Sequence, residues 1–370
     1  MQVVNRDSAQ HDPEDHDEHD PEDHDEHGHE DDDEVDQLVH VSDREAGIHR
    51  RGTRRFHYLD ERGRRVTDDR TLERIARLAV PPAWTDVWIC ADPLGHLQAT
   101  GRDQRGRKQS RYHTMFRSER ENVKFGQLAD FGDVLAPIRR AVQHDLSGRT
   151  PTLRRQTALV VHLLDLTAAR IGNEQYARSN KSFGLTTLRS RQARVHGADV
   201  EFEFVGKGGR RHHIDLHDRR LARLVAQCQD LPGQHLFTFV DEHGDVRSVC
   251  SQQVNDYLRE TSGGPFTAKT FRTWTATVNA ATVLAADRRP PTTRGLLVGI
   301  DHAADLLGNT RAVCRSSYVH PLVQEHYLDG TLATLWRQGP SRPTAALTRP
   351  ERRTLHVLRS GDLRRGTAAA

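Results

Sequence analysis

The chain has 370 residues, of which 35% are hydrophobic and 29% are charged, and its formal net charge is +2. This length suits two domains, but the apolar content is low for a wholly globular protein, so we expect part of the chain to be unfolded. The sequence shows neither an apolar run long enough to span a membrane nor a signal-peptide pattern, which argues against a membrane or exported protein and predicts a cytoplasmic one.

Residues 1 to 37 are predicted to form a disordered, acidic, His-rich tail. Residues 11 to 34 contain fifteen Asp or Glu, six His and no Lys or Arg, and the octapeptide at 12 to 19 is repeated at 20 to 27. Such a segment cannot bury apolar surface. Its histidines could bind divalent Ni, Zn or Cu weakly, and a solvated spacer is the alternative. We expect no fixed zinc site and no disulfide framework elsewhere, because the four cysteines lie far apart.

Without this tail the chain is strongly basic. Residues 1 to 36 hold 17 acidic residues and one basic residue, so residues 37 to 370 hold 35 acidic and 53 basic residues, a net charge of +18. That charge favours a polyanionic partner such as nucleic acid. A surface charged only for solubility is the alternative, although such surfaces usually mix the two signs more evenly.

Residues 38 to 117 are predicted to form a small β-rich domain. One helix is expected near residues 71 to 78, stopped by Pro81 and Pro82. The domain ends in a basic segment, residues 101 to 113, which we expect to be a flexible loop that lies along a nucleic-acid backbone or in a groove. A solvated surface turn is the alternative. The candidate binding residues in this segment are Arg102, Arg105, Arg107, Lys108, Arg111 and Tyr112.

Residues 118 to 337 are predicted to form a larger domain that is mostly helical. Thr150 and Pro151 suggest the N-cap and the first residue of a helix. Residues 189 to 216 instead alternate apolar and polar side chains, which predicts strands that reverse at a glycine-rich turn over residues 206 to 210. The combination of helices and hairpin strands predicts an α+β fold.

The last segment, residues 338 to 370, is a basic extension that is Pro-rich at its start. Thr348 and Glu351 have the spacing of a capping box, in which the two side chains and backbone amides bond reciprocally. This pattern predicts one short helix in the extension.

Lys207, in the glycine-rich turn, is conspicuous because lysine is rare in this chain. Only five of the 54 basic residues are lysines, and the rest are arginines. A guanidinium keeps its proton near neutral pH, whereas an ammonium on a flexible stem can have its pKa lowered until it serves as a general acid. An ordinary cation at a hairpin tip is the alternative.

A second group of residues has the chemistry of phosphoryl transfer. Lys269 and Arg272 lie three residues apart on a predicted helix and therefore share a face. Together with Arg170 they can bind phosphate oxygens, while the Tyr318 phenol can attack phosphorus. Asn309 precedes Tyr318 by nine residues, which on one continuous helix amounts to about 900° and opposite faces. The two side chains can therefore meet in one site only if the helix breaks between them.

In several stretches the chain resembles the type IB DNA topoisomerases of the small branch found in poxviruses and bacteria, over about residues 45 to 337. The resemblance implies that Tyr318 is the nucleophile, that Arg170 and Arg272 clamp the phosphate, and that Lys207, assisted by Lys269, protonates the 5′ leaving oxygen. Many members of this family have histidine where this chain has Asn309. The matching stretches are residues 81 to 88 (PPAWTDVW), 101 to 113, 170 to 174 (RIGNE), 184 to 188 (GLTTL), 269 to 274 (KTFRTW) and 307 to 310 (LGNT).

The resemblance also implies an architecture and an activity. The fold would be a bilobed clamp around duplex DNA, with a small β-rich lobe and a mostly α catalytic lobe that contains a three-stranded sheet. The protein would be a nucleoid-associated monomer that relaxes supercoils by transient single-strand cleavage through a 3′-phosphotyrosyl intermediate. It would need no ATP, metal or other cofactor. Two alternatives remain, a tyrosine recombinase, which usually has histidine where this chain has Lys269, and a nonenzymatic DNA-binding protein of the nucleoid.

Overall fold

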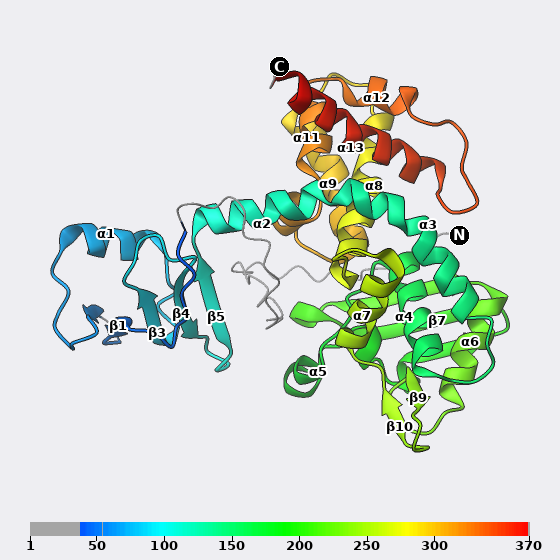
Figure 1. The fold of residues 1–370 in the computed structure, drawn as a ribbon, viewed down its shortest axis with the longest axis horizontal. Coiled ribbons are helices and arrows are strands. Elements are labelled where there is room, and N and C mark those ends of the chain that lie inside the picture. Colours follow the sequence, from blue (N-terminus) through cyan, green and yellow to red (C-terminus); the bar gives the residue numbers. More distant parts are fainter. Residues whose placement is uncertain (1–37, 54, 369–370) are drawn as a thin grey trace. The chain divides into compact units, whose positions relative to one another are not determined.

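The computed structural model describes residues 38 to 53 and 55 to 368, with side chains as far as residue 360. These residues form two compact units, one that ends at Lys124 and one that begins at Phe125 (Figure 1). The predicted acidic tail lies outside the described residues. Its disorder and its metal binding therefore stay predictions, as do the domain boundaries.

The N-terminal unit is built on a five-stranded antiparallel sheet. One helix, α1 (Asp69–Arg77), covers it, and Ile75 of this helix is buried with Ile89 and Ala99 of the sheet. The Asp68 carboxylate caps α1 by accepting from the Thr71 amide, which agrees with the predicted position of this helix. The strand order is β2-β1-β3-β4-β5, over β1 (Gly47–Arg51), β2 (His57–Leu59), β3 (Thr85–Cys90), β4 (Leu97–Arg102) and β5 (Lys108–Tyr112).

The prediction of a flexible loop over residues 101 to 113 is wrong, because most of this segment is a β-hairpin. β4 and β5 pair with Arg102 opposite Lys108. The turn between them is closed by the Asp103 carboxylate, which accepts from the backbone amides of Arg105 and Arg107, both at 2.9 Å. A single aspartate thus organises a segment whose glycines and charges had suggested flexibility.

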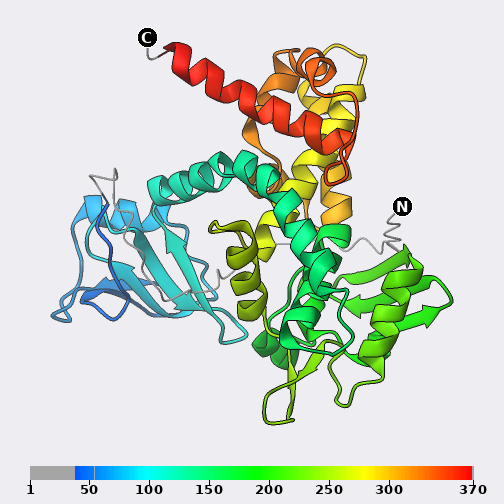
Figure 2. The ribbon, with the colours of Figure 1, turned by 45° about the vertical axis from the view of Figure 1, so that its right-hand side comes forward.

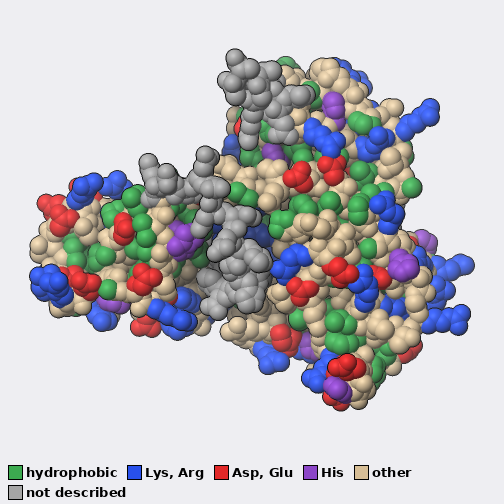
Figure 3. Space-filling model, viewed as in Figure 1, with side chains coloured by type: hydrophobic (Ala, Val, Ile, Leu, Met, Phe, Trp, Pro, Cys, Tyr) green, Lys and Arg blue, Asp and Glu red, His purple; other side chains and the backbone are tan. Residues whose placement is uncertain are grey.

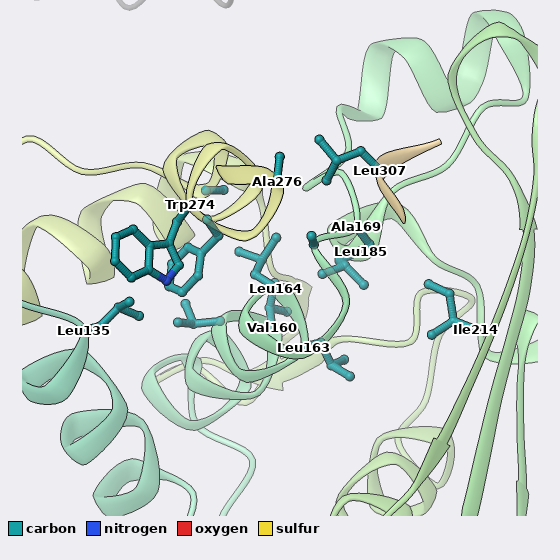
Figure 4. Close-up of a cluster of buried hydrophobic side chains, with 14 of the residues drawn as sticks. Leu135, Val160, Leu163, Leu164, Ala169, Leu185, Ile214, Trp274, Ala276 and Leu307 are labelled. Carbon is teal, nitrogen blue, oxygen red and sulfur yellow. The ribbon is translucent and has the colours of Figure 1, made fainter. Parts of the chain in front are cut away.

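The second unit has a helical core. In Figure 4, Leu135 of α3 (Leu128–Asp145) and Leu164 of α4 (Leu153–Thr167) lie near Trp274 of α8 (Ala268–Ala286), and all three side chains are buried. The predicted start of α4 was wrong by two residues. The N-cap is Thr152, whose hydroxyl accepts from a backbone amide of the first turn, so the proline precedes the cap.

A three-stranded antiparallel sheet, β6-β7-β8, lies on another side of the helical core (Figure 2). Along β7 the predicted alternation is confirmed, since Phe202 and Phe204 are buried while Glu203 is exposed. The buried face packs against α6. The bounds here are α5 (Glu174–Asn180), β6 (Ala193–His196), β7 (Asp199–Val205), β8 (Arg211–His217), α6 (Arg219–Gln229), β9 (Thr238–Val240), β10 (Val246–Ser248) and α7 (Ser251–Ser262).

The C-terminal part consists of short helices and one long one. The break predicted between Asn309 and Tyr318 is displaced to the two ends of that interval. One helix, α10 (Arg311–Ser317), fills the interval, Asn309 lies in the gap after α9, and Tyr318 lies in the gap that ends where Pro321 opens α11. The extension holds a helix of 20 residues, longer than the short helix predicted, and α13 packs on α3, α8 and α12. The helices are α9 (Thr293–Leu307), α10 (Arg311–Ser317), α11 (Pro321–Leu328), α12 (Leu332–Gln338) and α13 (Arg349–Ala368).

The surface carries charges of both signs. On the face drawn in Figure 3, lysine and arginine side chains are scattered over both units, with acidic side chains among them. The four cysteines are free, as the sequence suggested, and only Cys250 is exposed. In the part of the chain that the structure describes, no helix is both long and apolar enough to cross a membrane.

A partly buried ion cluster fixes α13 to the helical core. Arg139 of α3 pairs with Asp165 of α4 at 2.8 Å and with Glu351 of α13 at 2.7 Å. The Glu351 carboxylate also accepts from the Thr348 amide, and the predicted capping box is thereby confirmed. Burial alone would raise the pKa of Glu351, but the ion pair with Arg139 outweighs it and lowers that pKa. The stabilisation by this ion pair is complete above the pKa that the Glu351 carboxyl has in the unfolded chain. It is lost as the pH falls through the lower pKa of the same carboxyl in the folded protein.

We expect Glu351→Ala to lower the free energy of unfolding by about 1.5–3 kcal/mol, because the partly buried Arg139 charge loses one of its two carboxylate partners. Urea denaturation measures this loss. Asp133→Ala is the matched control, because it removes an exposed pair with Arg359 that also joins α3 to α13, and it should cost about 1 kcal/mol or less. Equal losses in the two variants would contradict the role given to the partly buried cluster.

Candidate active site

In the second unit, two of the predicted site residues, Arg170 and Arg272, meet at the side-chain amide of a third, Asn309. The Asn309 side-chain oxygen accepts from Nη2 of Arg170 at 2.5 Å and from Nη2 of Arg272 at 3.4 Å. Arg170 follows the end of α4, Arg272 belongs to α8, and Asn309 follows the end of α9. Segments that are distant in sequence thus bring two guanidinium groups and an amide together.

The ends of α4 and α9 are held by the same arginine. Nη1 of Arg272 donates to the carbonyl of Ala168 at 2.5 Å, and Nη2 donates to the carbonyl of Leu307 at 3.0 Å. Ala168 and Gly308, which cap these helices, both have left-handed backbone conformations, with φ of 50° and 61°. The left-handed caps turn the chain so that Arg170 and Asn309 point back to Arg272.

The backbone at Arg170 is held by the segment of residues 184 to 188 (GLTTL). Leu185 donates its amide to the carbonyl of Arg170 at 2.9 Å. The two chains approach so closely that a Cβ on Gly184 would lie 2.4 Å from the backbone nitrogen of Gly172. Glycine at both positions therefore allows the approach that orients Arg170.

Tyr318 lies in the break between α10 and α11 and is only 5% exposed. The Arg272 guanidinium carbon is 5.3 Å from the centre of its ring. The hydroxyl of Thr277 on α8 donates to the Tyr318 carbonyl at 3.1 Å and accepts from the His320 amide at 3.2 Å. One threonine thus ties the broken helix to the helix that carries Arg272.

The electrostatics of the site favour anions. Burial raises the pKa of Tyr318, but the charges of Arg272, Lys269 and Arg170 outweigh it and hold that pKa below the ordinary value. Burial and the neighbouring charge of Arg272 lower the pKa of Arg170. A guanidinium is so basic that Arg170 nevertheless stays charged near neutral pH. A phenolate and a phosphate would both be stabilised here.

Several buried hydrogen-bond donors in the site have no acceptor among the described residues. Nη1 of Arg170, Nε of Arg272 and Nδ2 of Asn309 are buried, and none of the described residues accepts a hydrogen bond from them. Buried polar groups left unpaired cost free energy, so native proteins rarely keep them without a function. Two guanidinium groups and an amide offer the geometry that the nonbridging oxygens of a phosphate require.

The two lysines of the predicted site lie at its margins. Lys269 is one turn before Arg272 on the same helix, is exposed, and contributes to the lowered pKa of Tyr318. Lys207 is half-buried at the start of the turn between β7 and β8. Arg210, from the end of the same turn, reaches the site and donates to the carbonyl of Asn309 at 3.4 Å.

Sequence reasoning missed Arg210 and Thr277. Arg210 shares the turn with Lys207, and its position there was the available signal, but one arginine among 49 does not stand out. Thr277 carried no signal at all, because a threonine inside a helix commonly bonds only to its own turn.

The candidate DNA-binding residues of the N-terminal unit all lie on the β4–β5 hairpin and its turn. Arg107 pairs with Asp103 at 2.6 Å and Lys108 with Asp43 at 2.8 Å, while Arg102 is 3.7 Å from the Asp86 carboxylate. Arg105 is exposed at the turn, Arg111 lies over the Trp84 ring, and Tyr112 stacks on Phe116. The hairpin gathers these side chains on one element, and their binding of DNA stays a prediction.

Comparisons with known proteins show the family of this chain. The family described as "Eukaryotic DNA topoisomerase I, catalytic core" matches residues 113–329, and the family described as "Bacterial DNA topoisomerase IB, N-terminal domain" matches residues 55–103. The chain belongs to the type IB DNA topoisomerase family. The resemblance inferred from the sequence is therefore confirmed, and as a type IB topoisomerase the protein is an isomerase that acts on DNA.

Viral relatives of this type IB topoisomerase cover most of the chain. DNA topoisomerase 1B of Acanthamoeba polyphaga mimivirus is 31% identical over 283 residues, which are 74% of this chain and 84% of the viral one. DNA topoisomerase 1 of Rabbit fibroma virus (strain Kasza) is 24% identical over 269 residues, 69% of this chain and 81% of its own. All six proposed catalytic residues fall within the matched catalytic core, whereas α13 lies beyond it.

We expect Asn309→Asp to reduce covalent adduct formation by about 10²-fold or more, the scale seen when an oxyanion donor is lost. The added carboxylate would pair with Arg170 and Arg272 and repel a phosphate. Gel separation of protein–DNA adducts measures the yield. Asn309→His, which keeps a donor and resembles many family members, should retain much more adduct. Full adduct formation by Asn309→Asp would show that this amide does not contact the phosphate.

Proposed function

We propose that the enzyme relaxes supercoiled DNA by cutting and resealing one strand of a duplex through Tyr318. The phenol oxygen attacks the scissile phosphorus, an ester with the 3′ phosphate forms, and the bond to the 5′ oxygen breaks. The free end rotates, and attack of the 5′ hydroxyl on the ester restores the strand and releases the phenol. The observation that carries this proposal is the set of buried donors of Arg170, Arg272 and Asn309 that no described residue accepts, with the Arg272 guanidinium over the Tyr318 ring.

Each arginine has a role that follows from its position. Arg170 and Arg272 hold the nonbridging oxygens and offset the charge that builds up on them in the transition state. The same charges lower the pKa of Tyr318 and so favour the attacking phenolate. Asn309 would donate its free amide N–H to the phosphate. The phosphotyrosyl ester keeps the energy of the broken bond, so resealing requires neither ATP nor a metal.

The leaving 5′ oxygen needs a proton, and we assign this to Lys207 with assistance from Lys269. The support is that the turn of Lys207 already reaches the site through Arg210. Arginine cannot do this task near neutral pH, which gives a reason for lysine in a chain that otherwise uses arginine.

The proposal extends to how DNA is held. The N-terminal unit, through its β4–β5 hairpin, and the catalytic unit would enclose duplex DNA as the two lobes of a clamp. The enzyme would act as a monomer, associated with the nucleoid in the cytoplasm. Positive charge on both units supports a polyanionic substrate.

Tyr318→Phe should abolish the relaxation of supercoiled plasmid in EDTA and the covalent adduct, while DNA affinity stays nearly unchanged. The change removes only the attacking oxygen, and the bond from Thr277 goes to the backbone, so the fold is kept. Tyr327→Phe is the matched control, because this buried tyrosine bonds to Asp287 and should be dispensable for relaxation. A covalent adduct formed by Tyr318→Phe would identify another nucleophile.

Deletion of residues 1 to 36 should tighten DNA binding, most strongly at low salt. This segment carries 17 acidic residues and one basic residue, and a tethered polyanion competes with DNA for a basic surface. Titration of labelled duplex at two ionic strengths measures the effect. Equal affinities at low salt would refute competition and leave the spacer or metal-binding interpretation of the tail.

A further inference from the structure

His212 of β8 is a buried residue beside the site to which the mechanism above gives no role. Its ring is stacked on Phe204 of β7, with centroids 5.0 Å apart and an angle of 16° between the planes. The residue is 9% exposed. Its neighbour His213 faces the other side of the sheet, half-buried, next to Glu201 and Asp215.

The His212 ring fills the space between two glycines that flank the proposed catalytic residues. A Cβ on Gly206 would lie 2.6 Å from ring atoms of His212, and a Cβ on Gly308 would lie 2.9 Å from its Cε1. Gly206 immediately precedes Lys207, and Gly308 immediately precedes Asn309. The imidazole therefore contacts both the turn that carries the proposed acid and the turn that carries the phosphate-binding amide.

The turn needs such support, because its own sequence makes it pliable. Gly208 and Gly209 both have positive φ, at 71° and 75°, and both are exposed. Glycines in this region have the widest conformational freedom of any residue. The backbone bond from Gly206 to Arg210 at 2.7 Å closes the turn. Across to the segment after α9, the Arg210 side chain donates a long bond of 3.4 Å to the Asn309 carbonyl, which leaves the position of the turn weakly fixed without further packing.

We propose that His212 is a positioning residue that holds the Lys207 turn at a fixed distance from Asn309 and the two arginines. The inference rests on the proposed function, in which Lys207 protonates the 5′ leaving oxygen. Proton transfer requires hydrogen-bond reach, and a displacement of about 1 Å can cost about 10²-fold in rate. In this proposal the ring acts by its flat shape, which lies close against both glycines.

The test is single-turnover cleavage of two substrates, an ordinary duplex and one in which sulfur replaces the bridging 5′ oxygen. A thiolate leaves without a proton, so a defect in protonation disappears on the sulfur substrate. His212→Ala should cleave the oxygen substrate about 10²-fold more slowly and recover most of that loss on sulfur. His213→Ala, the adjacent control, should match the unmodified enzyme on both substrates.

His212→Phe keeps a flat ring between the glycines and should cleave the oxygen substrate much faster than His212→Ala. If His212→Ala does not fold, as judged by its melting temperature, His212→Phe alone carries the test. A rate near that of the unmodified enzyme supports positioning by shape. A slow His212→Phe enzyme, or a His212→Ala enzyme that is equally slow on both substrates or unimpaired on oxygen, would overturn the inference.

Lys207→Ala, measured in parallel, separates this inference from the function on which it rests. Recovery of Lys207→Ala on sulfur, without recovery of His212→Ala, would reject the positioning role and leave the acid assignment intact. Failure of Lys207→Ala to recover would reject Lys207 as the acid and the positioning role with it.

Discussion

The buried guanidinium of Arg272 is the group on which the rest of the site depends. It is 4% exposed, and a charge at that depth is costly unless it is hydrogen-bonded. Its partners are the carbonyls of Ala168 and Leu307, at the ends of α4 and α9, where the helix dipoles supply partial negative charge. Folding of this unit therefore assembles the site, because the bonds that stabilise the charge also place Arg170 and Asn309.

The site still carries an excess of positive charge. Arg170 and Arg272 share one neutral amide, and burial together with the charge of Arg272 lowers the pKa of Arg170. A phosphate would relieve the repulsion between the two guanidinium groups and would satisfy the buried N–H groups. The free protein thus carries an electrostatic cost that a phosphate bound at these residues would remove, which is a common compromise between stability and function.

Much of this arrangement could be predicted from the sequence, and the failures have physical causes. The helical spacing of Lys269 and Arg272 and the new helix that Pro321 opens just after Tyr318 follow from local rules that tertiary contacts did not override. The hairpin at residues 101 to 113 was mistaken for a flexible loop because one Asp side chain organises its turn. The roles of Arg210 and His212 depend on contacts across the fold, between β7–β8 and α9, which no local pattern encodes.

The most direct test is a crystal structure of the enzyme trapped covalently on duplex DNA. It should show the 3′ phosphate bonded to Tyr318, with its nonbridging oxygens about 3 Å from Nη1 of Arg170, from Arg272 and from Nδ2 of Asn309. A phosphate on another tyrosine would contradict the central claim. So would a phosphate on Tyr318 that leaves these donors without an acceptor.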